Sequence, residues 1–150
     1  MQEKPDHHDA ELLLKLYELR REEKLRRARE WFVQHFQSEP TEELVQRYPP
    51  GSEENAFFRM AVGYWEMAAS LLNHGLIHED LFFENTMEML VVWSKLKPAA
   101  ASVRERSKNP RAWKNLEDAA GRYEKWLEKR APGALAVALE RMQLFSAKKH

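Results

Sequence analysis

Residues 52–75 read SEENAFFRMAVGYWEMAASLLNHG, and this stretch decides the fold. Ser52 is a good N-cap residue, the two glutamates after it suit the positive end of a helix dipole, and Gly75 suits a left-handed C-cap. The residues between them are apolar almost all round. The polar exceptions are spaced by four or three residues, which places them on one narrow strip of the helix: Arg59, Gly63, Glu66, Ser70 and Asn73. The stretch therefore predicts a long central helix that ends near His74.

Helical spacing of apolar residues continues on both sides of this stretch, and prolines and glycines separate the segments. A long first helix is expected over residues 6–37, with an aspartate near its start as the N-cap. A fourth helix is expected over residues 79–97, where Pro98 removes a backbone donor and kinks or ends it. An asparagine followed by Pro110 predicts the start of a fifth helix, and the break at residues 131–133 precedes a last one.

The sequence thus predicts an all-α fold, an up-and-down bundle of five to six helices with a long N-terminal helix and a proline-kinked fourth helix. A chain of 150 residues fits one domain. We expect residues 1–150 to form this single helical-bundle domain, with residues 1–8 and 146–150 frayed at its ends.

Composition excludes several classes of function. The chain has no cysteine, so disulfides, thiolate zinc sites, iron–sulfur clusters and cysteine nucleophiles are ruled out. Its five glycines are never clustered, which removes the glycine-rich loops that hold dinucleotides and phosphates. No apolar run reaches the roughly 18 to 20 residues that span a bilayer, and no secretory signal is recognised. We therefore expect no transmembrane segment and a cytoplasmic location.

The net charge is zero, but the charges are unevenly placed. Residues 52–90 hold one arginine against seven acids, whereas residues 91–150 hold fourteen lysines and arginines against six acids. A basic run with Trp113 interleaved is a candidate for contact with phosphate or with an anionic membrane surface: Arg104, Arg106, Lys108 and Arg111. The preferred interpretation is a solvated face that pairs with the acidic middle of the chain, with neither nucleic acid nor a membrane as its partner.

Two histidines after the central helix, His74 and His78, are candidate metal ligands. On a continuous helix they would share one face, but Gly75 interrupts that helix. The Glu-x-x-His pattern of di-iron bundles does not occur in the sequence. Glu79 and Asp80 are better explained as acids in the first turn of the next helix. We therefore expect no metal and no cofactor.

Three glutamates, Glu66, Glu84 and Glu88, are predicted to lie on helices that pack together. Carboxylates in an apolar setting can have separated pKa values suited to acid–base work, so a small enzyme or ligand-binding site around Glu66 is one hypothesis. It requires Glu66 to be unpaired at the floor of a pocket with aromatic walls: Trp65, Phe83 or Trp93. The structural alternative pairs Glu66 with Arg59 or with a facing basic residue. No nucleophile accompanies the carboxylates, so no catalytic residue is assigned.

The segments YWEMA at 64–68, NHGLI at 73–77 and DLF at 80–82, followed by Trp93 and Pro98, resemble an uncharacterised all-helical family of bacterial and phage proteins, a domain of unknown function. The resemblance covers residues 55–125. It implies a helical fold and no particular activity. Some members of that family look membrane-tethered through an added N-terminal span, a feature that this sequence does not show.

The sequence favours a non-catalytic helical module that binds a protein partner or a second copy of itself. Its apolar content suffices to leave a surface patch, and its opposite charge blocks can dock head to tail or on a partner. The expected contact elements are the basic run and the long first helix, the latter through Arg20, Arg21, Arg26, Arg27 and Trp31. A ligand-binding bundle and a place in a larger assembly stay open as alternatives.

Overall fold

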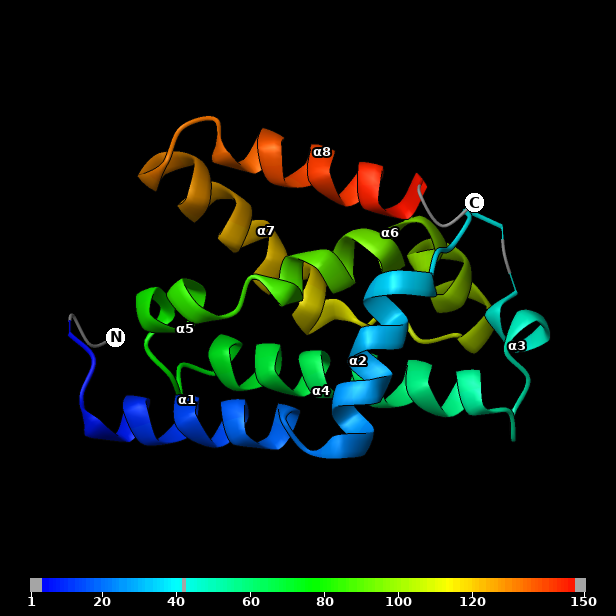
Figure 1. Cartoon of the computed structure of the whole chain (residues 1–150), viewed down its shortest axis with the longest axis horizontal. Coiled ribbons are helices and arrows are strands. Elements are labelled where there is room, and N and C mark those ends of the chain that lie inside the picture. Colours follow the sequence, from blue (N-terminus) through cyan, green and yellow to red (C-terminus); the bar gives the residue numbers. More distant parts are fainter. Residues whose placement is uncertain (1–3, 42, 148–150) are drawn as a thin grey trace.

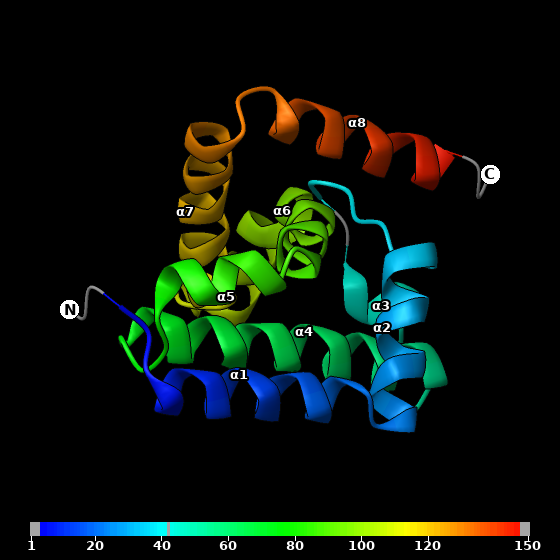
Figure 2. The same ribbon diagram turned by 60° about the vertical axis from the view of Figure 1, so that its left-hand side comes forward.

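The computed structural model describes residues 4–41 and 43–147, and every regular element in these ranges is a helix (Figure 1). The helices are α1 (His7–Arg20), α2 (Glu23–His35), α3 (Leu44–Arg47), α4 (Glu53–Asn73), α5 (Glu79–Asn85), α6 (Glu88–Ser107), α7 (Lys114–Arg130) and α8 (Ala134–Ala147). The all-α prediction is confirmed. The described ranges hold eight helices rather than five or six, and α2 and α7 cross α4 steeply in both views, which departs from a simple up-and-down arrangement (Figures 1 and 2).

The central helix is confirmed with the caps that the sequence predicts. The Ser52 hydroxyl accepts a hydrogen bond from the backbone N–H of Asn55 at 3.1 Å. At the other end Gly75 has a φ of +75°, and the N–H of Leu76 donates to the carbonyl of Leu71 at 3.1 Å. This is the left-handed helix ending that glycine permits. The resulting α4 runs through the middle of the molecule, between α1 and the layers formed by α5, α6 and α7 (Figure 1).

The predicted long first helix is wrong, because it is divided into α1 and α2. Asp6 caps α1, which therefore begins at His7, inside the stretch expected to be frayed. The division falls at Glu22, whose carboxylate accepts the backbone N–H groups of Lys24 at 3.1 Å and Leu25 at 3.0 Å. These bonds lower the pKa of Glu22. Glu22, which the sequence places inside one long helix, instead starts a second helix, which turns to cross α4 (Figure 2).

The predicted fourth helix is also divided, and it does not end at Pro98. The Asn85 amide donates to the Leu81 carbonyl at 2.9 Å, and the Thr86 hydroxyl donates to the Phe82 carbonyl at 2.5 Å. The two side chains therefore take over carbonyls at the end of α5. The following helix, α6, continues through Pro98, whose ring lies on the exposed side while the neighbouring alanines pack in the core. The kink stays a prediction.

The fifth predicted helix begins at Lys114, four residues beyond Pro110. The side-chain oxygen of Asn109 accepts a hydrogen bond from the backbone N–H of Arg111 at 3.0 Å. This bond closes a turn and does not start a helix. Trp113, the residue before α7, is left-handed with a φ of +60°. The residues outside the described ranges are 1–3, 42 and 148–150, so residues 1–3 and 148–150 of the two expected frayed ends lie outside them. The single domain stays a prediction.

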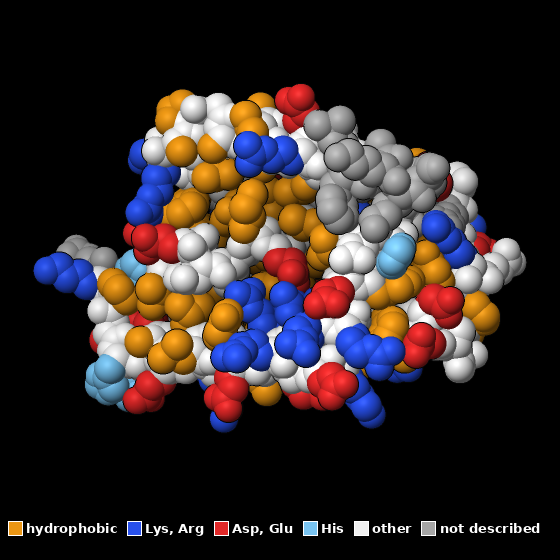
Figure 3. Space-filling model, in the orientation of Figure 1, with side chains coloured by type: hydrophobic (Ala, Val, Ile, Leu, Met, Phe, Trp, Pro, Cys, Tyr) orange, Lys and Arg blue, Asp and Glu red, His pale blue; other side chains and the backbone are white. Residues whose placement is uncertain are grey.

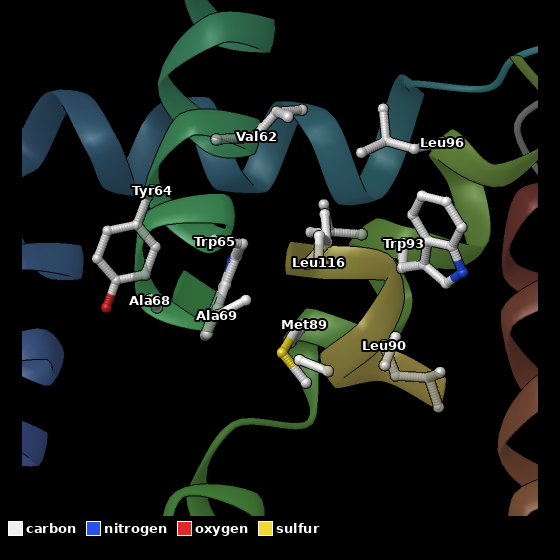
Figure 4. Packing of buried hydrophobic residues seen from close by; sticks show 14 of the residues in the cluster. Val62, Tyr64, Trp65, Ala68, Ala69, Met89, Leu90, Trp93, Leu96 and Leu116 are labelled. Atoms are coloured by element: carbon white, nitrogen blue, oxygen red, sulfur yellow. The ribbon is translucent and has the colours of Figure 1, made fainter. Parts of the chain in front are cut away.

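The core lies where α2, α4, α6 and α7 meet. Its largest fully buried side chains include Phe32 of α2, Trp65 of α4, Met89 of α6 and Leu116 of α7. Figure 4 places Leu116 between the indole rings of Trp65 and Trp93. Burying one such side chain is worth about 1.5–3 kcal/mol. The last helix, α8, follows α7 and lies on the far side of the molecule from α1 (Figures 1 and 2).

Candidate functional site

Glu66 lies on α4 and caps the N-terminus of α7. One carboxylate oxygen accepts the N–H of Leu116 at 2.8 Å, and the other accepts the N–H and the side-chain amide of Asn115 at 3.3 and 2.9 Å. A carboxylate at this position satisfies helix N–H groups and opposes the helix dipole. Glu66 is therefore not the unpaired carboxylate that a catalytic pocket requires. Its partner is also not Arg59, which donates to Asn55 on the same helix at 2.9 Å.

A second polar contact lies two turns further along the same strip of α4. The Asn73 amide donates to the backbone and side-chain oxygens of Asn115 at 3.1 and 3.0 Å. Arg122 of α7 donates to the Asn73 side-chain oxygen at 2.7 Å and to Glu79 of α5 at 2.8 Å. The polar strip that the sequence predicts on α4 thus faces α7 and fastens it at two places. Glu66 and Asn73 of this strip therefore hold α4 and α7 together.

Glu88 forms a junction between four helices. Arg29 of α2 binds its carboxylate through two hydrogen bonds of 2.7 and 2.9 Å, and the Trp65 indole N–H donates to it at 2.9 Å. The same guanidinium donates to the carbonyl of Arg20 at the end of α1, at 2.8 Å. The side chains of Arg29 and Glu88 are only 17% and 21% exposed. Such a charge pair with further hydrogen bonds fits a structural role.

The three candidate glutamates do not converge on one site. Glu66 meets α7, Glu88 meets Arg29, and Glu84 forms a surface ion pair of 3.1 Å with Arg130. Together with the Glu79–Arg122 contact, the last pair joins the acidic middle of the chain to its basic C-terminal part. That pairing agrees with the preferred interpretation of the two charge blocks. A ligand-binding role for these residues stays a prediction.

The basic run around the α6–α7 turn is partly engaged within the molecule. Arg104 donates to the carbonyl of Ala112 at 2.8 Å and lies 3.0 Å from Glu117. Arg106 forms an ion pair of 2.5 Å with Glu43. Lys108 and Arg111 are exposed, and Trp113 packs half-buried against the core: it meets Phe58 edge to face, with ring centroids 6.1 Å apart. An indole packed against the core is a poor stacking platform for a nucleic-acid base.

Two arginines at the end of α1 stack on an exposed aromatic ring. The Arg20 guanidinium carbon lies 4.9 Å from the centroid of the Tyr17 ring, and that of Arg21 lies 5.6 Å from it. Tyr17 is 47% exposed, and Leu14, one turn earlier on α1, is 65% exposed. A groove of about 260 Å³ runs beside them, between α1 and the end of α5. This part of α1 therefore leaves apolar and cationic groups together in solvent.

The remaining candidates on α2 are divided between surface and core. Arg26 is exposed. Arg27 lies over the Phe57 ring at 5.6 Å and 3.9 Å from Glu53 of α4. Trp31 is half-buried among aromatic rings, with the Tyr48 centroid 5.3 Å away in an edge-to-face arrangement. In Figure 3, lysine and arginine side chains gather over the corner between α1 and α2, next to a hydrophobic area over α1. Of the three candidates on α2, Arg26 and Arg27 are exposed at the surface, and Trp31 packs against the core.

The candidate metal ligands His74 and His78 both contact helix ends. The Nδ1 atom of His74 lies 2.8 Å from the Ser70 carbonyl oxygen, and His78 caps α5 by accepting the N–H of Leu81 at 3.4 Å. Across residues 4–41 and 43–147, histidine, aspartate and glutamate side chains nowhere form a group of three or more placed to bind a metal ion.

A cleft that the sequence analysis missed lies between α8 and the helices beneath it. It has a volume of about 910 Å³ and is lined by α2, α6, α7, the α7–α8 link and α8. Its walls are mostly apolar, and Lys95 and Arg141 are the charged residues that line it. Figure 3 shows hydrophobic side chains gathered below α8. Ala134 and Ala138, one turn apart on α8, line this cleft, and their spacing is a sequence signal that was not used to predict a hollow.

Two polar groups in the cleft walls are affected by burial. Burial lowers the pKa of Lys95, whose ammonium group donates to the Phe36 carbonyl at 3.1 Å. Burial raises the pKa of Tyr123, which is 3% exposed and packs against Phe83 and Trp126 with centroids 5.3 and 5.8 Å away. The Tyr123 hydroxyl therefore stays neutral around pH 7. The charge carried by the walls of the cleft is accordingly positive.

None of the described helices is both long enough and apolar enough to cross a membrane. These features define a class: a small all-helical protein whose partly buried carboxylates join helices, with an apolar cleft beneath α8 and an arginine-rich surface at the corner between α1 and α2. Residues 5–126 match the family described as Domain of unknown function (DUF4760), and the chain belongs to that family. The match includes residues 55–125, so the resemblance to an uncharacterised family is confirmed. Searches of curated proteins and of solved structures each gave no match.

Proposed function

We propose that the protein is a non-catalytic helical module, acting in the cytoplasm, that binds another protein through the exposed surface of α1 and the start of α2. We call this surface the arginine face and define it by five residues: Leu14, Tyr17, Arg20, Arg21 and Arg27. The observation that carries the proposal is that an exposed tyrosine ring lies beside an exposed leucine and beneath two guanidinium groups.

These residue types are the ones that carry binding energy at protein interfaces. Tyrosine and arginine are enriched among the few interface residues whose truncation is costly, and lysine is depleted. Stacking on Tyr17 restricts Arg20 and Arg21 before a partner arrives, so less side-chain entropy is lost on binding. The arginine face therefore suits a partner that offers carboxylates next to an apolar side chain.

The charge pairs within the chain favour a different protein over a second copy. Glu79 and Glu84 of the acidic middle already pair with Arg122 and Arg130, and Glu88 pairs with Arg29. Fewer carboxylates are then available to meet the arginine face of another copy. Self-association remains one of the outcomes that the experiment distinguishes.

The test compares two immobilised variants in a lysate of the source organism. The first, Tyr17→Ala with Arg21→Ala, removes the ring and one of its guanidinium groups. The matched control, Leu76→Ala with Arg111→Ala, removes an exposed apolar group and an exposed cation from elsewhere on the surface. Quantitative mass spectrometry should find a protein retained by the wild type and the control but not by the first variant.

The captured protein is then titrated into each purified variant by calorimetry. Loss of one interface hot spot costs about 2 kcal/mol or more, so the first variant should bind about 30-fold more weakly. Equal capture by both variants, or no protein enriched by the wild type, would contradict the proposal. Sedimentation of the wild type as a dimer, disrupted only in the first variant, would replace it with self-association.

A further inference from the structure

The cleft beneath α8, here called the α8 cleft, lies away from the arginine face and has a distinct chemistry. We propose that it binds a single-chain anionic amphiphile of about ten carbons, with the charged head between Lys95 and Arg141 and the chain directed toward the α7–α8 link. This site is independent of the proposed protein interface.

The two cations lie at the same end of the α8 cleft. Lys95 belongs to α6 and Arg141 to α8, and both line the cleft. Their neighbours in sequence touch, because the Ser94 hydroxyl lies 3.6 Å from the sulfur of Met142. This contact brings the two helices together beside the cations. Among the described residues that line the cleft there is no aspartate or glutamate, so the charge complementarity selects an anionic head group.

The rest of the α8 cleft is apolar, and one face of α6 and one face of α8 form its long walls. Met87, Val91 and Lys95 recur every four residues and so line one face of α6, over a rise of about 12 Å. On α8 the stretch from Ala134 to Arg141 spans about 10 Å. An extended polypeptide advances about 3.6 Å per residue, which is about 1.2 Å for each of its three backbone bonds. An extended alkyl chain with a similar advance per bond therefore needs about ten bonds to cover about 12 Å.

The dimensions favour a small amphiphile over a protein segment. The volume of about 910 Å³ falls inside the range of roughly 300 to 1,000 Å³ found for small-molecule sites. Residues 131–133, which link α7 to α8, line the end opposite the cations. A ligand with one charged end and an apolar tail of about 12 Å fits both the cationic end and the apolar end of the cleft. A partner helix would continue beyond the cleft in both directions.

The first measurement is calorimetric titration of the full chain with sodium octanoate, sodium decanoate and decanol. Each buried methylene should strengthen binding about fourfold, so decanoate should bind about 15-fold more tightly than octanoate. Decanol keeps the chain and removes the charge, and it should bind at least tenfold more weakly than decanoate.

Variants assign the binding to the α8 cleft. Arg141→Gln, at an exposed position, should weaken decanoate about tenfold and leave decanol unchanged. Lys95→Gln should act in the same way. Val91→Phe, midway between Met87 and Lys95 in the cleft wall, should weaken both ligands by filling the space for the chain. The matched control, Arg111→Gln, removes an exposed cation outside the cleft and should bind like the wild type.

Three results would overturn the proposal. They are the absence of saturable decanoate binding, equal affinity for decanoate and decanol, and wild-type affinity in the Arg141→Gln variant. A wild-type dimer that Val91→Phe converts to a monomer would show that the α8 cleft is filled by a second copy. If Lys95→Gln does not fold, the exposed Arg141→Gln variant decides the charge question alone.

Discussion

Replacing Glu66 separates the structural role of this carboxylate from a functional one. Glu66→Gln keeps the side-chain length but removes the charge and turns one acceptor oxygen into an amide donor. The carboxylate accepts from the N–H of Leu116 at 2.8 Å and from two donors of Asn115 at 2.9 and 3.3 Å. The glutamine amide would face at least one of these N–H groups. We therefore expect a loss of stability with no unfolding of the other helices.

The size of the loss follows from these contacts. Loss of a helix cap costs about 0.5–2 kcal/mol, and a charge at the helix N-terminus adds about 0.3–1 kcal/mol. The free energy of unfolding should therefore fall by about 2 kcal/mol in Glu66→Gln. At this chain length 1 kcal/mol moves the melting temperature by about 2–4 °C, so the variant should melt roughly 4–8 °C lower. Glu66→Ala, which keeps no acceptor, should lose more.

Urea denaturation followed by circular dichroism measures this loss. The matched control is Glu30→Gln, an exposed glutamate on α2, whose free energy of unfolding should stay within about 0.5 kcal/mol of the wild type. A Glu66→Gln protein as stable as the wild type would refute the reasoning. If such a protein also lost a binding activity, Glu66 would be a functional residue after all.

Three further predictions concern other contacts. Arg29→Ala leaves the Glu88 carboxylate partly buried without its main partner. Urea denaturation should therefore show that the free energy of unfolding falls by about 3 kcal/mol. A fall of less than about 1 kcal/mol would rule out a central role for this junction. Gly75→Ala meets no atoms within 4 Å, so only its left-handed φ of +75° is strained, and chemical denaturation should show a cost of about 1 kcal/mol. Burial raises the pKa of Tyr64 to about 12. Between pH 10 and 12 the unfolded chain releases this proton while the folded chain largely keeps it, so the unfolding free energy should fall by about 2 kcal/mol, and Tyr64→Phe should flatten this fall measurably.

Local signals in the sequence predicted the helices that depend on them. The boundaries of α4 came from Ser52 and Gly75, and the start of α8 came from the glycine before it. The divisions at Glu22 and Thr86 were missed because both residues are compatible with a helix interior. In the fold their side chains satisfy backbone groups that end or begin a helix, and that choice depends on where the next helix packs.

The start of α7 was missed for a different reason. The sequence offers a local cap, Asn109, but the cap that operates is Glu66, some fifty residues earlier on α4. No inspection of neighbouring residues can find a cap supplied by another helix. The sequence predicted the polar strip on α4 but not the helix that packs against it. Periodicity shows which residues share a face of a helix, and it does not show which element that face contacts.

Loss of hydration explains why the glutamates that invite a catalytic interpretation have partners within the chain. A carboxylate between helices loses hydration, and it persists there only when charges or N–H groups replace the lost water. Glu66 and Glu88 meet that condition, because each carboxylate accepts three hydrogen bonds within the chain: Glu66 from the start of α7, and Glu88 from Arg29 and Trp65. Partly buried charge in a helical bundle is thus evidence for a partner within the chain. Binding is better sought where that requirement is absent, at exposed groups such as Tyr17 and in hollows such as the α8 cleft.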